Sequence, residues 1–336
     1  MLGGMSIGVV ILNWNGREDT LNCLASFQES TYKNFELIVV DNGSTDDSVS
    51  CVKEKFPDVT LLETSKNLGY AGGNNVGISY ALKKNHAFVL LLNNDTVVSK
   101  DMLKSFMESA EKNPGVGIFG GVPLLFSNPE KLDHLGGNWN RKKAQFELIG
   151  RGEKSSFSWK EPLDYVCGCC MLIRKEVFHK IGVLEPDYFL FWEEADFCMR
   201  AKRAGFDTAV CHEATLLHKV SASFIGGSIH KTYFWWRNRF LWIKRNCPVK
   251  ERLSISLRVL LPELFHIYKL RLIKSAELRL LKIMRSKKDL EQKQLKIRQY
   301  QAALQGFRDY LNNHFGNGPA WIFERPKRKD LKKISD

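Results

Sequence analysis

Three acidic side chains stand within four residues of one another in the segment WEEADF, at positions 192–197. Glu193, Glu194 and Asp196 repel one another, and their aromatic neighbours disfavour the charged form, so we expect at least one raised carboxyl pKa. A carboxyl group whose pKa lies near neutrality can act as a general base. The same acids are typical of the first turn of a helix, with Arg200 following at helical spacing, and spacing alone favours neither interpretation.

A single aspartate ends the apolar run of LLLNNDTVVS, residues 90–99. Asp95 offers a carboxylate, and Asn93 offers an amide oxygen two positions earlier. Hard cations such as Mg²⁺ and Mn²⁺ accept oxygen ligands and keep several waters, so one protein carboxylate is enough where a diphosphate supplies further oxygens. The pattern is equally compatible with a plain turn at the end of a strand.

Two further polar loops could hold a nucleotide. Asp41 opens DNGSTDD (41–47) directly after a branched apolar run. Its carboxylate can accept a hydrogen bond from a base or a ribose, or else satisfy N–H groups of its own turn. The loop NLGYAGGNN (67–75) is rich in glycines, which let the backbone approach a ligand. It lacks the G-x-G-x-x-G spacing and the P-loop lysine, so it supports a dinucleotide or ATP site only weakly.

Histidine and cysteine give weaker signals. His212 and His218 lie close together in HEATLLH, but a lone histidine is more often structural than a ligand. The segment CGCC (167–170) contains a C-x-x-C spacing, yet a zinc site normally needs a second pair or histidines at matching spacing, and Cys198 or Cys211 would have to supply it. We therefore expect these small, soft residues to pack beneath a site.

The elements that must position these side chains alternate along the first part of the chain. Apolar runs typical of buried strands are separated by amphipathic segments, the pattern of βαβ units with a mainly parallel sheet. The predicted strands cover residues 7–12, 35–40, 59–63 and 87–92. Ligands of such sheets bind beyond the carboxyl ends of the strands. Since polar loops follow all four strand ends, at 13–16, 41–47, 67–75 and 93–96, we expect the loops to meet at one rim.

Two of the intervening helices carry start signals. The helix before the third strand is predicted to be capped by Ser44 or Thr45, with Asp46 and Asp47 in its first turn. The helix after the third strand is predicted to begin near Gly73, within the glycine loop.

The remaining sequence divides into a glycine-rich section, about residues 115–230, and a basic section. Residues 1–230 contain 24 Lys and Arg against 28 Asp and Glu, a net charge of −4, whereas residues 231–336 contain 26 against 9, a net charge of +17. Such a basic segment indicates an anionic partner, which is a membrane surface, a nucleic acid or a phosphorylated substrate. The basic section is Leu-rich and helical in pattern to about residue 300.

The basic section suggests a membrane surface more than a membrane span. No stretch of eighteen uncharged apolar residues occurs in the chain. Residues 253–274 predict an amphipathic helix that could rest on an anionic membrane, or serve as a plain helical extension or an oligomer contact. Arg237 and Arg239, set among tryptophans, could hold a phosphate or a sugar, or snorkel at a membrane. The section lacks a recognisable base-reading module, so we expect no nucleic-acid partner.

Chain length limits the number of domains, and cysteine usage indicates the redox compartment. A chain of 336 residues with 44% hydrophobic residues can bury a substantial core, as one large domain or two smaller ones. The eight cysteines are scattered, and no charge, apolar core and cleavage pattern of a signal peptide opens the sequence. We therefore expect a reducing, cytoplasmic setting.

Taken together, the motifs resemble the family 2 glycosyltransferases, inverting enzymes of GT-A fold, and especially their rhamnosyltransferase-like branch. The resemblance covers about residues 6–245. It rests on motifs that occur in family order: VVILNWNG, LIVVDNGSTDDS, NLGYAGGNNVG, LLLNNDTVV, GCCMLIRKEVFHKIG, EPDYFLFWEEADFCMRAKRAGF and a late His followed by S-x-S. It implies an α/β fold of GT-A (Rossmann-like) type, with a mainly parallel mixed sheet flanked by helices and a basic helical C-terminal extension.

The resemblance also implies a division of the chain. The glycosyltransferase domain covers residues 1–230, with a nucleotide-binding half at about 6–115 and an acceptor half at about 116–230. The basic, amphipathic helical extension covers residues 231–336.

Roles for individual residues follow from the same resemblance. It assigns nucleotide-sugar binding to Asn13, Asp41, Asn67, Gly69, Asn74, Asn93 and Asn94, with Asp41 reading a pyrimidine base. Asn93 and Asp95 match the D-x-D metal motif, with Asn in place of the first Asp, and His218 completes the shell of Mg²⁺ or Mn²⁺. Glu194 matches the Asp of the catalytic E-D motif and is one methylene longer, and Glu193 is the competing base. Asp196 orients the helix or an acceptor hydroxyl.

The implied function is a metal-dependent, inverting transfer of a sugar, with rhamnose favoured, from a dTDP- or UDP-sugar. The acceptor is a saccharide or a lipid-linked saccharide in the synthesis of a cell-surface polysaccharide. The implied location is the cytoplasm, peripheral on the anionic inner face of the cell membrane. The alternative is a catalytically weak nucleotide-sugar-binding scaffold at the membrane.

Overall fold

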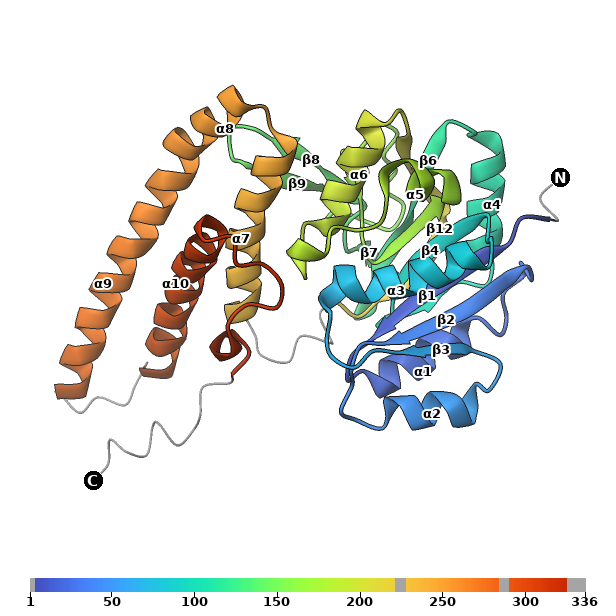
Figure 1. The fold of residues 1–336 in the computed structure, drawn as a ribbon, viewed down its shortest axis with the longest axis horizontal. Coiled ribbons are helices and arrows are strands. Elements are labelled where there is room, and N and C mark those ends of the chain that lie inside the picture. Colours follow the sequence, from blue (N-terminus) through green and yellow to red (C-terminus); the bar gives the residue numbers. More distant parts are fainter. Residues whose placement is uncertain (1–3, 221–227, 284–289, 325–336) are drawn as a thin grey trace. The chain divides into compact units, whose positions relative to one another are not determined.

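Residues 4–220, 228–283 and 290–324 are described by the computed structural model of the chain (Figure 1). The chain forms two compact units, one of Met1–Asn140 and Phe146–Ser223 and the other of Arg141–Gln145 and Phe224–Asp336. The late S-x-S motif, Ser221 and Ser223, lies outside the described residues. The division into domains at residue 230 stays a prediction.

Four parallel strands form the part of the sheet that the sequence predicts. In spatial order they are β3 (Thr60–Glu63), β2 (Phe35–Asp41), β1 (Ile7–Asn13) and β4 (Phe88–Asn93). All four predicted strands are confirmed. Asn13 pairs with Asp41, and Leu12 pairs with Asn93, so three polar strand ends lie side by side.

The sheet continues beyond β4 with strands of both directions. The order is β4, β11 (Cys170–Arg174), β6 (Val116–Leu125), β12 (Asp207–His218) and β5 (Thr96–Val98), and β7 (Asn128–Leu132) pairs with β6. β11 runs antiparallel to both of its neighbours, whereas β12 runs parallel to β6. The expectation of an α/β fold with a mixed, mostly parallel sheet is confirmed.

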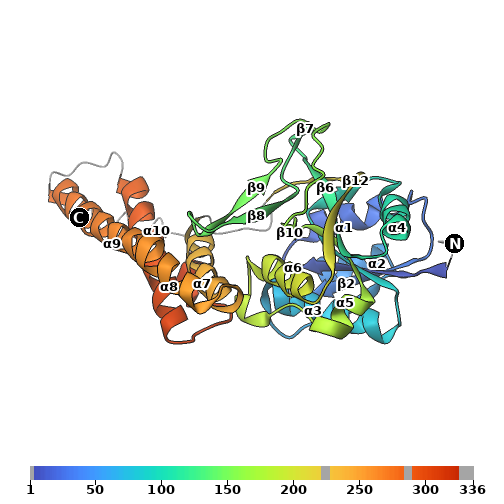
Figure 2. The same cartoon turned by 90° about the horizontal axis from the view of Figure 1, so that it is seen from above.

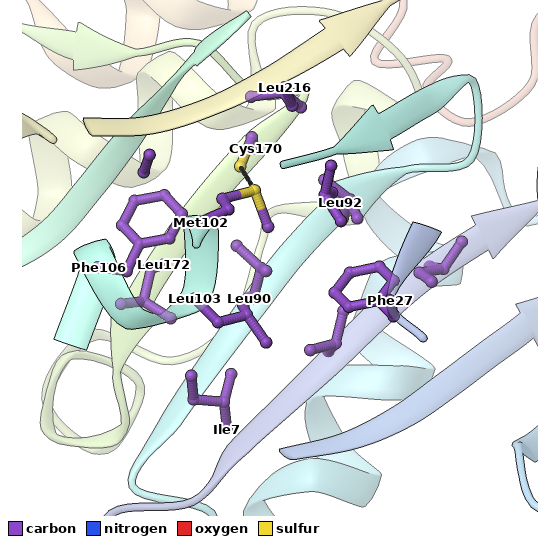
Figure 3. Packing of buried hydrophobic residues seen from close by; sticks show 14 of the residues in the cluster. Ile7, Phe27, Leu90, Leu92, Met102, Leu103, Phe106, Cys170, Leu172 and Leu216 are labelled. Atoms are coloured by element: carbon purple, nitrogen blue, oxygen red, sulfur yellow. Dashed lines mark hydrogen bonds between the residues drawn. The ribbon is translucent and has the colours of Figure 1, made fainter. Parts of the chain in front are cut away.

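Helices cover both faces of this sheet. On one face, α1 (Arg17–Ser26), α2 (Ser48–Lys55) and α4 (Met102–Lys112) pack on alternate strand residues in a continuous apolar core. Figure 3 shows Met102 of α4 beside Cys170, with 3.9 Å between the two sulfur atoms. α3 (Gly69–Lys83) covers the other face, where a Cβ on Gly77 would lie 2.3 Å from Val10. Only glycine permits this close approach.

Both predicted helix starts are wrong. α2 begins at Ser48, and Asp46 Oδ1 accepts hydrogen bonds from Ser48 N and Oγ at 3.2 and 2.6 Å, so this acid precedes the first turn. α3 begins at Gly69, because the carbonyl of Phe189 accepts a hydrogen bond from Tyr70 N at 2.6 Å and satisfies a donor of the first turn. A partner so distant in the chain leaves no local signal in the glycine loop.

The section after β7 contains a small sheet and two helices. β10 (Tyr165–Val166), β8 (Gly136–Asn140) and β9 (Gln145–Ile149) form this sheet in that order (Figure 2). α5 (Lys175–Ile181) follows β11, and a 3-10 turn at Pro186–Tyr188 leads towards α6 (Glu193–Arg203). The acidic segment therefore lies at the first turn of a helix, as one of the two sequence interpretations requires.

The second unit is helical. It contains α7 (Ser228–Asn246), α8 (Val249–Ile255), α9 (Leu261–Ile283) and α10 (Leu290–Leu311). α8 continues through one π-helical turn, Ser256–Leu260, into α9 (Figures 1 and 2). α10 packs against both α7 and α9.

The prediction that Arg237 and Arg239 hold a ligand or snorkel at a membrane is wrong. Both side chains are fully buried. Arg237 Nη1 donates to Gly316 O at 2.6 Å, and Arg239 donates to the carbonyls of Lys143 and Ala144 at 2.8 and 2.6 Å. Buried guanidinium groups need such partners, so these arginines hold backbone segments of the second unit together.

One face of the continuous segment formed by α8, the π-helical turn and α9 exposes apolar side chains instead of burying them. These residues, which we call the apolar stripe, recur every three or four positions: Val249, Leu253, Leu257, Leu261, Phe265, Tyr268 and Leu272. Lys250, Arg258 and Lys269 on the same helical segment are also exposed. Within the described ranges, none of the helices combines the length and the apolar character that crossing a bilayer requires.

Candidate active site

At the carboxyl ends of β1 and β2, a network of hydrogen bonds surrounds Asp41. Asn13 Nδ2 donates to Asp41 Oδ1 at 2.8 Å and to Ser44 Oγ at 3.2 Å. The backbone N–H of Ser44 donates to Asp41 Oδ2 at 3.0 Å. Asn13 and Asp41 are both buried. Each carboxylate oxygen of Asp41 therefore has a donor, and the group is held in one orientation.

Asn94 extends this network to the end of β4. Its Nδ2 donates to Thr20 Oγ1 at 2.9 Å, and Thr20 Oγ1 donates to Asn13 Oδ1 at 2.8 Å. A Cβ on Gly16 would lie 2.5 Å from Asn94 Nδ2, so a side chain at that position would displace the amide. The described contacts of Asn94 thus tie β4 to α1.

Asn42, which sequence reasoning missed, fixes the glycine loop. Its Nδ2 donates to Asn67 Oδ1 at 3.1 Å and to Gly69 O at 3.0 Å, and its Oδ1 accepts from Leu68 N at 2.9 Å. The only sequence signal for this role is its position beside Asp41 in a polar loop. Asn42 therefore connects the loop after β2 to the loop that begins α3.

Gly69 is required by a close backbone approach. It has a φ of +75°, and a Cβ there would lie 2.4 Å from the carbonyl oxygen of Phe189. One turn later, Asn74 is buried and donates from Nδ2 to Tyr70 O at 2.9 Å. Asn74 Oδ1 is buried without a hydrogen-bond partner in the described part of the chain. A buried amide oxygen of this kind is available to a donor on a ligand.

Asp95 and His218 come together at the edge of the sheet. His218 Nε2 lies 3.3 Å from Asp95 Oδ1, close enough for an ion pair but not aligned as a hydrogen bond. His218 Nδ1 lies 3.0 Å from Asp133 Oδ2. Burial by itself lowers the pKa of His218, but the hydrogen bond to Asp133 and the Asp95 carboxylate outweigh it and raise this pKa to about 10. The other candidate, His212, contacts the carbonyl of Trp159 at 2.9 Å.

A second polar cluster, also missed from the sequence, continues from Asp133. Its Oδ1 lies 3.4 Å from His134 Nδ1, which lies 3.9 Å from Cys167 Sγ. Cys167 Sγ is 3.4 Å from Cys169 Sγ. The contact with Cys169 lowers the pKa of the Cys167 thiol, and the charge of His134 acts in the same direction. Nothing in the segment DHLGG marks this convergence, because it depends on how β8 and β10 pair.

The backbone of residues 167–170 links the metal candidate to the acidic helix. Asn93 N donates to Cys169 O at 2.9 Å, and Tyr70 Oη donates to Gly168 O at 2.7 Å. A Cβ on Gly168 would lie 3.3 Å from Glu194 Cγ, so glycine leaves room for the Glu194 side chain. The segment therefore connects the end of β4 with the first turn of α6.

Glu193 and Glu194 are buried carboxyl groups that lack full hydrogen bonding. In each, Oε2 is buried and has no hydrogen-bond partner among the described residues. Burial, and then the charge of Glu194, raise the pKa of Glu193 well above its usual value. Burial raises the pKa of Glu194 to about 7. Glu193 is 4% exposed and Glu194 is half-buried, so Glu194 is the more accessible of the two.

Asp196 has the opposite surroundings on the same helix. It is fully buried, and it accepts hydrogen bonds from Tyr188 Oη at 3.2 Å and from Arg200 Nε at 2.9 Å. Arg200 in turn donates to the carbonyls of Ile181 and Val183 at 2.7 and 2.8 Å. Asp196 is thus placed to anchor α6, which is one of the two roles that the family resemblance implies.

The backbone before α6 is strained. Phe189, Phe191 and Trp192 have φ angles of +62°, +67° and +77°, a region that costs a bulky residue about 1–3 kcal/mol. The conformation of Phe189 accompanies the capping of α3, and Trp192 directly precedes Glu193. The strain therefore occurs where the glycine loop and the acidic turn are positioned.

The groups around Asp95 fit a divalent cation. Asp95 is 3% exposed, and its Oδ1 has no hydrogen-bond donor among the described residues. Carboxylate oxygen, the amide oxygen of Asn93 and the imidazole of His218, once the ion has displaced its proton, are donors that Mg²⁺ or Mn²⁺ can accept. The observation that supports this fit is a buried carboxylate oxygen that faces His218 but has no hydrogen bond among the described residues.

Comparison with known proteins gives a consistent family. The family model described as Glycosyl transferase family 2 matches residues 8–182. The chain is 28% identical over 243 residues to the low-salt glycan biosynthesis hexosyltransferase Agl10 of Haloferax volcanii, covering 70% of this chain and 74% of that protein. It is 25% identical over 263 residues to the N-acetylglucosaminyl-diphospho-decaprenol L-rhamnosyltransferase of Mycobacterium tuberculosis, covering 66% and 83%.

A solved structure shares the fold at low sequence identity. The mannosyltransferase PcManGT from Pyrobaculum calidifontis, in complex with GDP-Man and Mn²⁺, matches with a TM-score of 0.55 and 16% identity. The match covers 91% of this chain and 87% of that chain. It confirms the predicted GT-A type of fold.

Proposed function

We propose, from the premise that the chain belongs to glycosyl transferase family 2, that it transfers a sugar from a nucleoside diphosphate to an acceptor hydroxyl with inversion. The observation that carries the proposal is the pair Glu193 and Glu194, in each of which the buried Oε2 has no donor among the residues that the structure describes; Glu194 lies beside the backbone at Gly168. An unpaired carboxyl group with a pKa near 7 suits a general base. The binding residues and the base would then act at opposite sides of the reacting carbon.

The rim at Asp41 is the proposed site for the nucleoside. Its carboxylate is oriented by Asn13 and by the N–H of Ser44, so a base or ribose would meet a rigid acceptor. Asn67 on the glycine loop and Asn74 on α3 would contact the same ligand. Because these groups are already positioned, binding the donor costs little ordering entropy.

A divalent cation, Mg²⁺ or Mn²⁺, is proposed at Asp95, with Asn93 and His218 as further ligands. It would offset the negative charge that develops on the diphosphate leaving group. PcManGT, a protein of the same fold, is in complex with Mn²⁺ in its solved structure, which supports this part of the proposal. Asp133 would orient the His218 ring through the contact at Nδ1.

Glu194 is the proposed base. It removes the proton of the acceptor hydroxyl while the acceptor oxygen forms a bond to the anomeric carbon. The bond between that carbon and the diphosphate oxygen breaks, and the nucleoside diphosphate leaves with the electron pair. A single displacement inverts the carbon, so no second carboxylate is needed as a nucleophile. Glu193 is the more buried of the two, and burial and then the charge of Glu194 raise its pKa well above the usual value, which favours its protonated form beside Glu194.

The name of the mycobacterial relative supports the choice of substrates. That relative is a rhamnosyltransferase whose acceptor is lipid-linked by name. For this chain we propose a dTDP- or UDP-sugar as donor, with rhamnose first, and a saccharide or lipid-linked saccharide as acceptor. The product would belong to a cell-surface polysaccharide.

The apolar stripe of α8 and α9 supports peripheral attachment to an anionic membrane. Leu257 and Phe265 expose 65% and 70% of their surface, which is unfavourable in water and favourable in a lipid interface. The section from residue 231 carries a net charge of +17, which complements anionic headgroups. The proposed location is thus the cytoplasmic face of the cell membrane, where a lipid-linked acceptor would be within reach.

Vesicle sedimentation tests this attachment. Leu257→Ser together with Phe265→Ser should weaken binding to anionic vesicles by about tenfold or more, because each change removes exposed apolar area. Leu311→Ser is the matched control, since Leu311 is 59% exposed on α10 and lies off the stripe. Equal vesicle binding by the unaltered protein, the double variant and Leu311→Ser would contradict the attachment. Stronger binding of the unaltered protein to duplex DNA than to vesicles would also contradict it.

A panel of nucleotide sugars tests the function. Each UDP- and dTDP-sugar is added with Mn²⁺ or Mg²⁺, and donor turnover and the shift in melting temperature are measured. We expect one donor to give both a shift and metal-dependent turnover. Donor binding without turnover on any acceptor would favour the scaffold alternative, and no response to any donor would contradict the proposal.

A further inference from the structure

The cluster of Asp133, His134 and Cys167 has no part in the proposed transfer chemistry beyond the contact of Asp133 with His218. Asp133 and His134 directly follow β7, and Cys167 follows β10. One ligand atom from each of the three residues lies within 4.8 Å of the other two. Cys167 is buried, whereas His134 and Asp133 keep about a fifth and an eighth of their side-chain surface accessible, 19% and 13%. A small ion can therefore reach the cluster from solvent.

The three donor types define an ion preference. Thiolate, imidazole and carboxylate together are the ligand set of zinc sites, and a thiolate disfavours Mg²⁺. Two of the three distances are close to those of shared coordination, 3.4 Å from Asp133 Oδ1 to His134 Nδ1 and 3.9 Å from His134 Nδ1 to Cys167 Sγ, and the third pair lies within 4.8 Å. Ligand atoms around a tetrahedral zinc ion, at bonds of about 2.0–2.3 Å, lie roughly 3.3–3.8 Å apart. An ion bound by all three residues would draw the donors closer together.

We propose that Asp133, His134 and Cys167 form a Zn²⁺ site that is separate from the oxygen-rich site at Asp95. Cys169 is the fourth ligand in reach, because its Sγ lies 3.4 Å from that of Cys167. This distance is far longer than a disulfide bond of about 2.05 Å, so the two sulfurs are available as thiols. The site differs from the zinc pattern considered from the sequence, in which Cys198 or Cys211 supplied the remaining ligands.

The carboxylate of Asp133 connects the two proposed metal sites. Asp133 Oδ1 faces His134, while its Oδ2 contacts His218 Nδ1 at 3.0 Å. An ion bound by Oδ1 would hold the Asp133 carboxylate, and through it the ring of His218, in one orientation. The Zn²⁺ site is therefore structural, and its existence does not depend on sugar transfer.

Metal titration of the chelator-treated protein tests the site. Zn²⁺ is titrated against a chromophoric chelator, and Co²⁺ is added in parallel because a cobalt thiolate bond gives a charge-transfer band in the near ultraviolet. We expect one tight equivalent of Zn²⁺, the cobalt band, and a rise in melting temperature with Zn²⁺. Absence of the band and of tight Zn²⁺ binding in the unaltered protein would overturn the proposal and leave a hydrogen-bonded cluster only.

Variants locate the ligands. Cys167→Ser should weaken Zn²⁺ binding by at least 10²-fold and abolish the band, since it removes a first ligand. Cys51→Ser is the matched control, a half-buried cysteine on α2, and it should bind Zn²⁺ like the unaltered protein. His134→Gln, which keeps the thiol, provides a second test if Cys167→Ser folds poorly. Unchanged Zn²⁺ binding in His134→Gln, or in a folded Cys167→Ser, would overturn the proposal.

The two sites can be separated in one further experiment. Mn²⁺ binding, followed by the electron paramagnetic resonance of free Mn²⁺, should be lost in Asp95→Asn and kept in Cys167→Ser. Zn²⁺ binding should show the reverse pattern. If Asp95→Asn loses Zn²⁺ binding while Cys167→Ser keeps it, the proposal of a separate Zn²⁺ site is overturned. Tight Zn²⁺ binding in a protein that turns over no donor would contradict the proposed function while supporting the zinc site.

Discussion

Asp196 and the pair Glu193 and Glu194 lie within one turn of α6, yet their surroundings differ. Asp196 is fully buried and accepts hydrogen bonds from Tyr188 and Arg200. Glu193 and Glu194 each keep a buried oxygen with no donor among the described residues. A buried acid that has its donors stabilises the fold, whereas a buried acid without them has a raised pKa and can accept a proton.

The same contrast divides the strand ends. Asp41 has a donor for each oxygen, and Asp95 has a buried oxygen without one among the residues that the structure describes. We therefore assign Asp41 to rigid recognition and Asp95 to a cation. On our proposal, hydrogen-bond satisfaction, which sequence motifs do not display, distinguishes Asp41, which would bind the nucleoside, from Asp95, which would hold the cation.

Removal of the carboxylate at Asp95 should give the largest effect. Asp95→Ala should lower the transfer rate on the order of 10³-fold, because the leaving diphosphate loses its charge stabilisation. The rate is measured with saturating donor at increasing Mn²⁺. Circular dichroism provides the folding control. A variant that keeps full metal-dependent activity would refute the assignment of Asp95.

Removal of the satisfied acid at Asp196 should affect stability more than chemistry. Asp196→Asn should lower the free energy of unfolding by about 3 kcal/mol, because Arg200 loses its buried partner. Thermal melting measures this change, and Asp207→Asn, at an exposed position of β12, is the matched control. If the melting temperature is unchanged while the turnover rate falls by 10²-fold or more, Asp196 belongs with the reacting acids.

At the strand-end rim, where Asp41 has a donor for each oxygen, Asp41→Asn should reduce donor affinity on the order of 30-fold, about 2 kcal/mol. Turnover at saturating donor should change little. The amide would replace one acceptor by a donor and leave Asn13 or the Ser44 N–H without its partner. Calorimetric titration of the nucleoside diphosphate measures the affinity. Asp58→Asn, exposed before β3, should leave it unchanged. Equal affinity in Asp41→Asn would remove Asp41 from the nucleoside site.

The pH dependence should give the smallest effect, about tenfold between pH 6 and pH 8. Burial raises the pKa of Glu194 to about 7, so the ionised base is scarce below that pH and predominates above it. The turnover rate at saturating donor and metal should therefore rise through pH 7 and then level off. A flat profile from pH 5.5 to pH 8.5 would show that the base has an ordinary carboxyl pKa or is a different group.

The sequence predicted the parallel half of the sheet because its strands are long, branched apolar runs that end in polar loops. The expectation that Asn13, Asp41 and Asn93 share a rim followed from the parallel order, and the register of β1, β2 and β4 brings their strand ends together. The roles of these residues in binding stay predictions. Local patterns were enough here because each strand carries its own signal.

Tertiary partners account for what could not be predicted. α3 begins early because Phe189 supplies a carbonyl from a distant loop, and Arg237 and Arg239 are buried because carbonyls of the second unit receive their guanidinium groups. Asp133 and His134 gave no spacing signal, since their cluster with Cys167 forms only when β8 and β10 pair. In each case the decisive partner is remote in sequence.

The central claim, that Glu194 is the general base on α6 and the more buried Glu193 is not, is tested most directly by comparing Glu194→Gln with Glu193→Gln. Donor affinity and transfer rate are measured on the same protein samples, with the product anomer assigned by NMR. We expect Glu194→Gln to keep donor affinity within about threefold and to lose 10²–10⁴-fold in transfer rate. Glu193→Gln should keep most of its activity. Full transfer activity in Glu194→Gln would contradict the account.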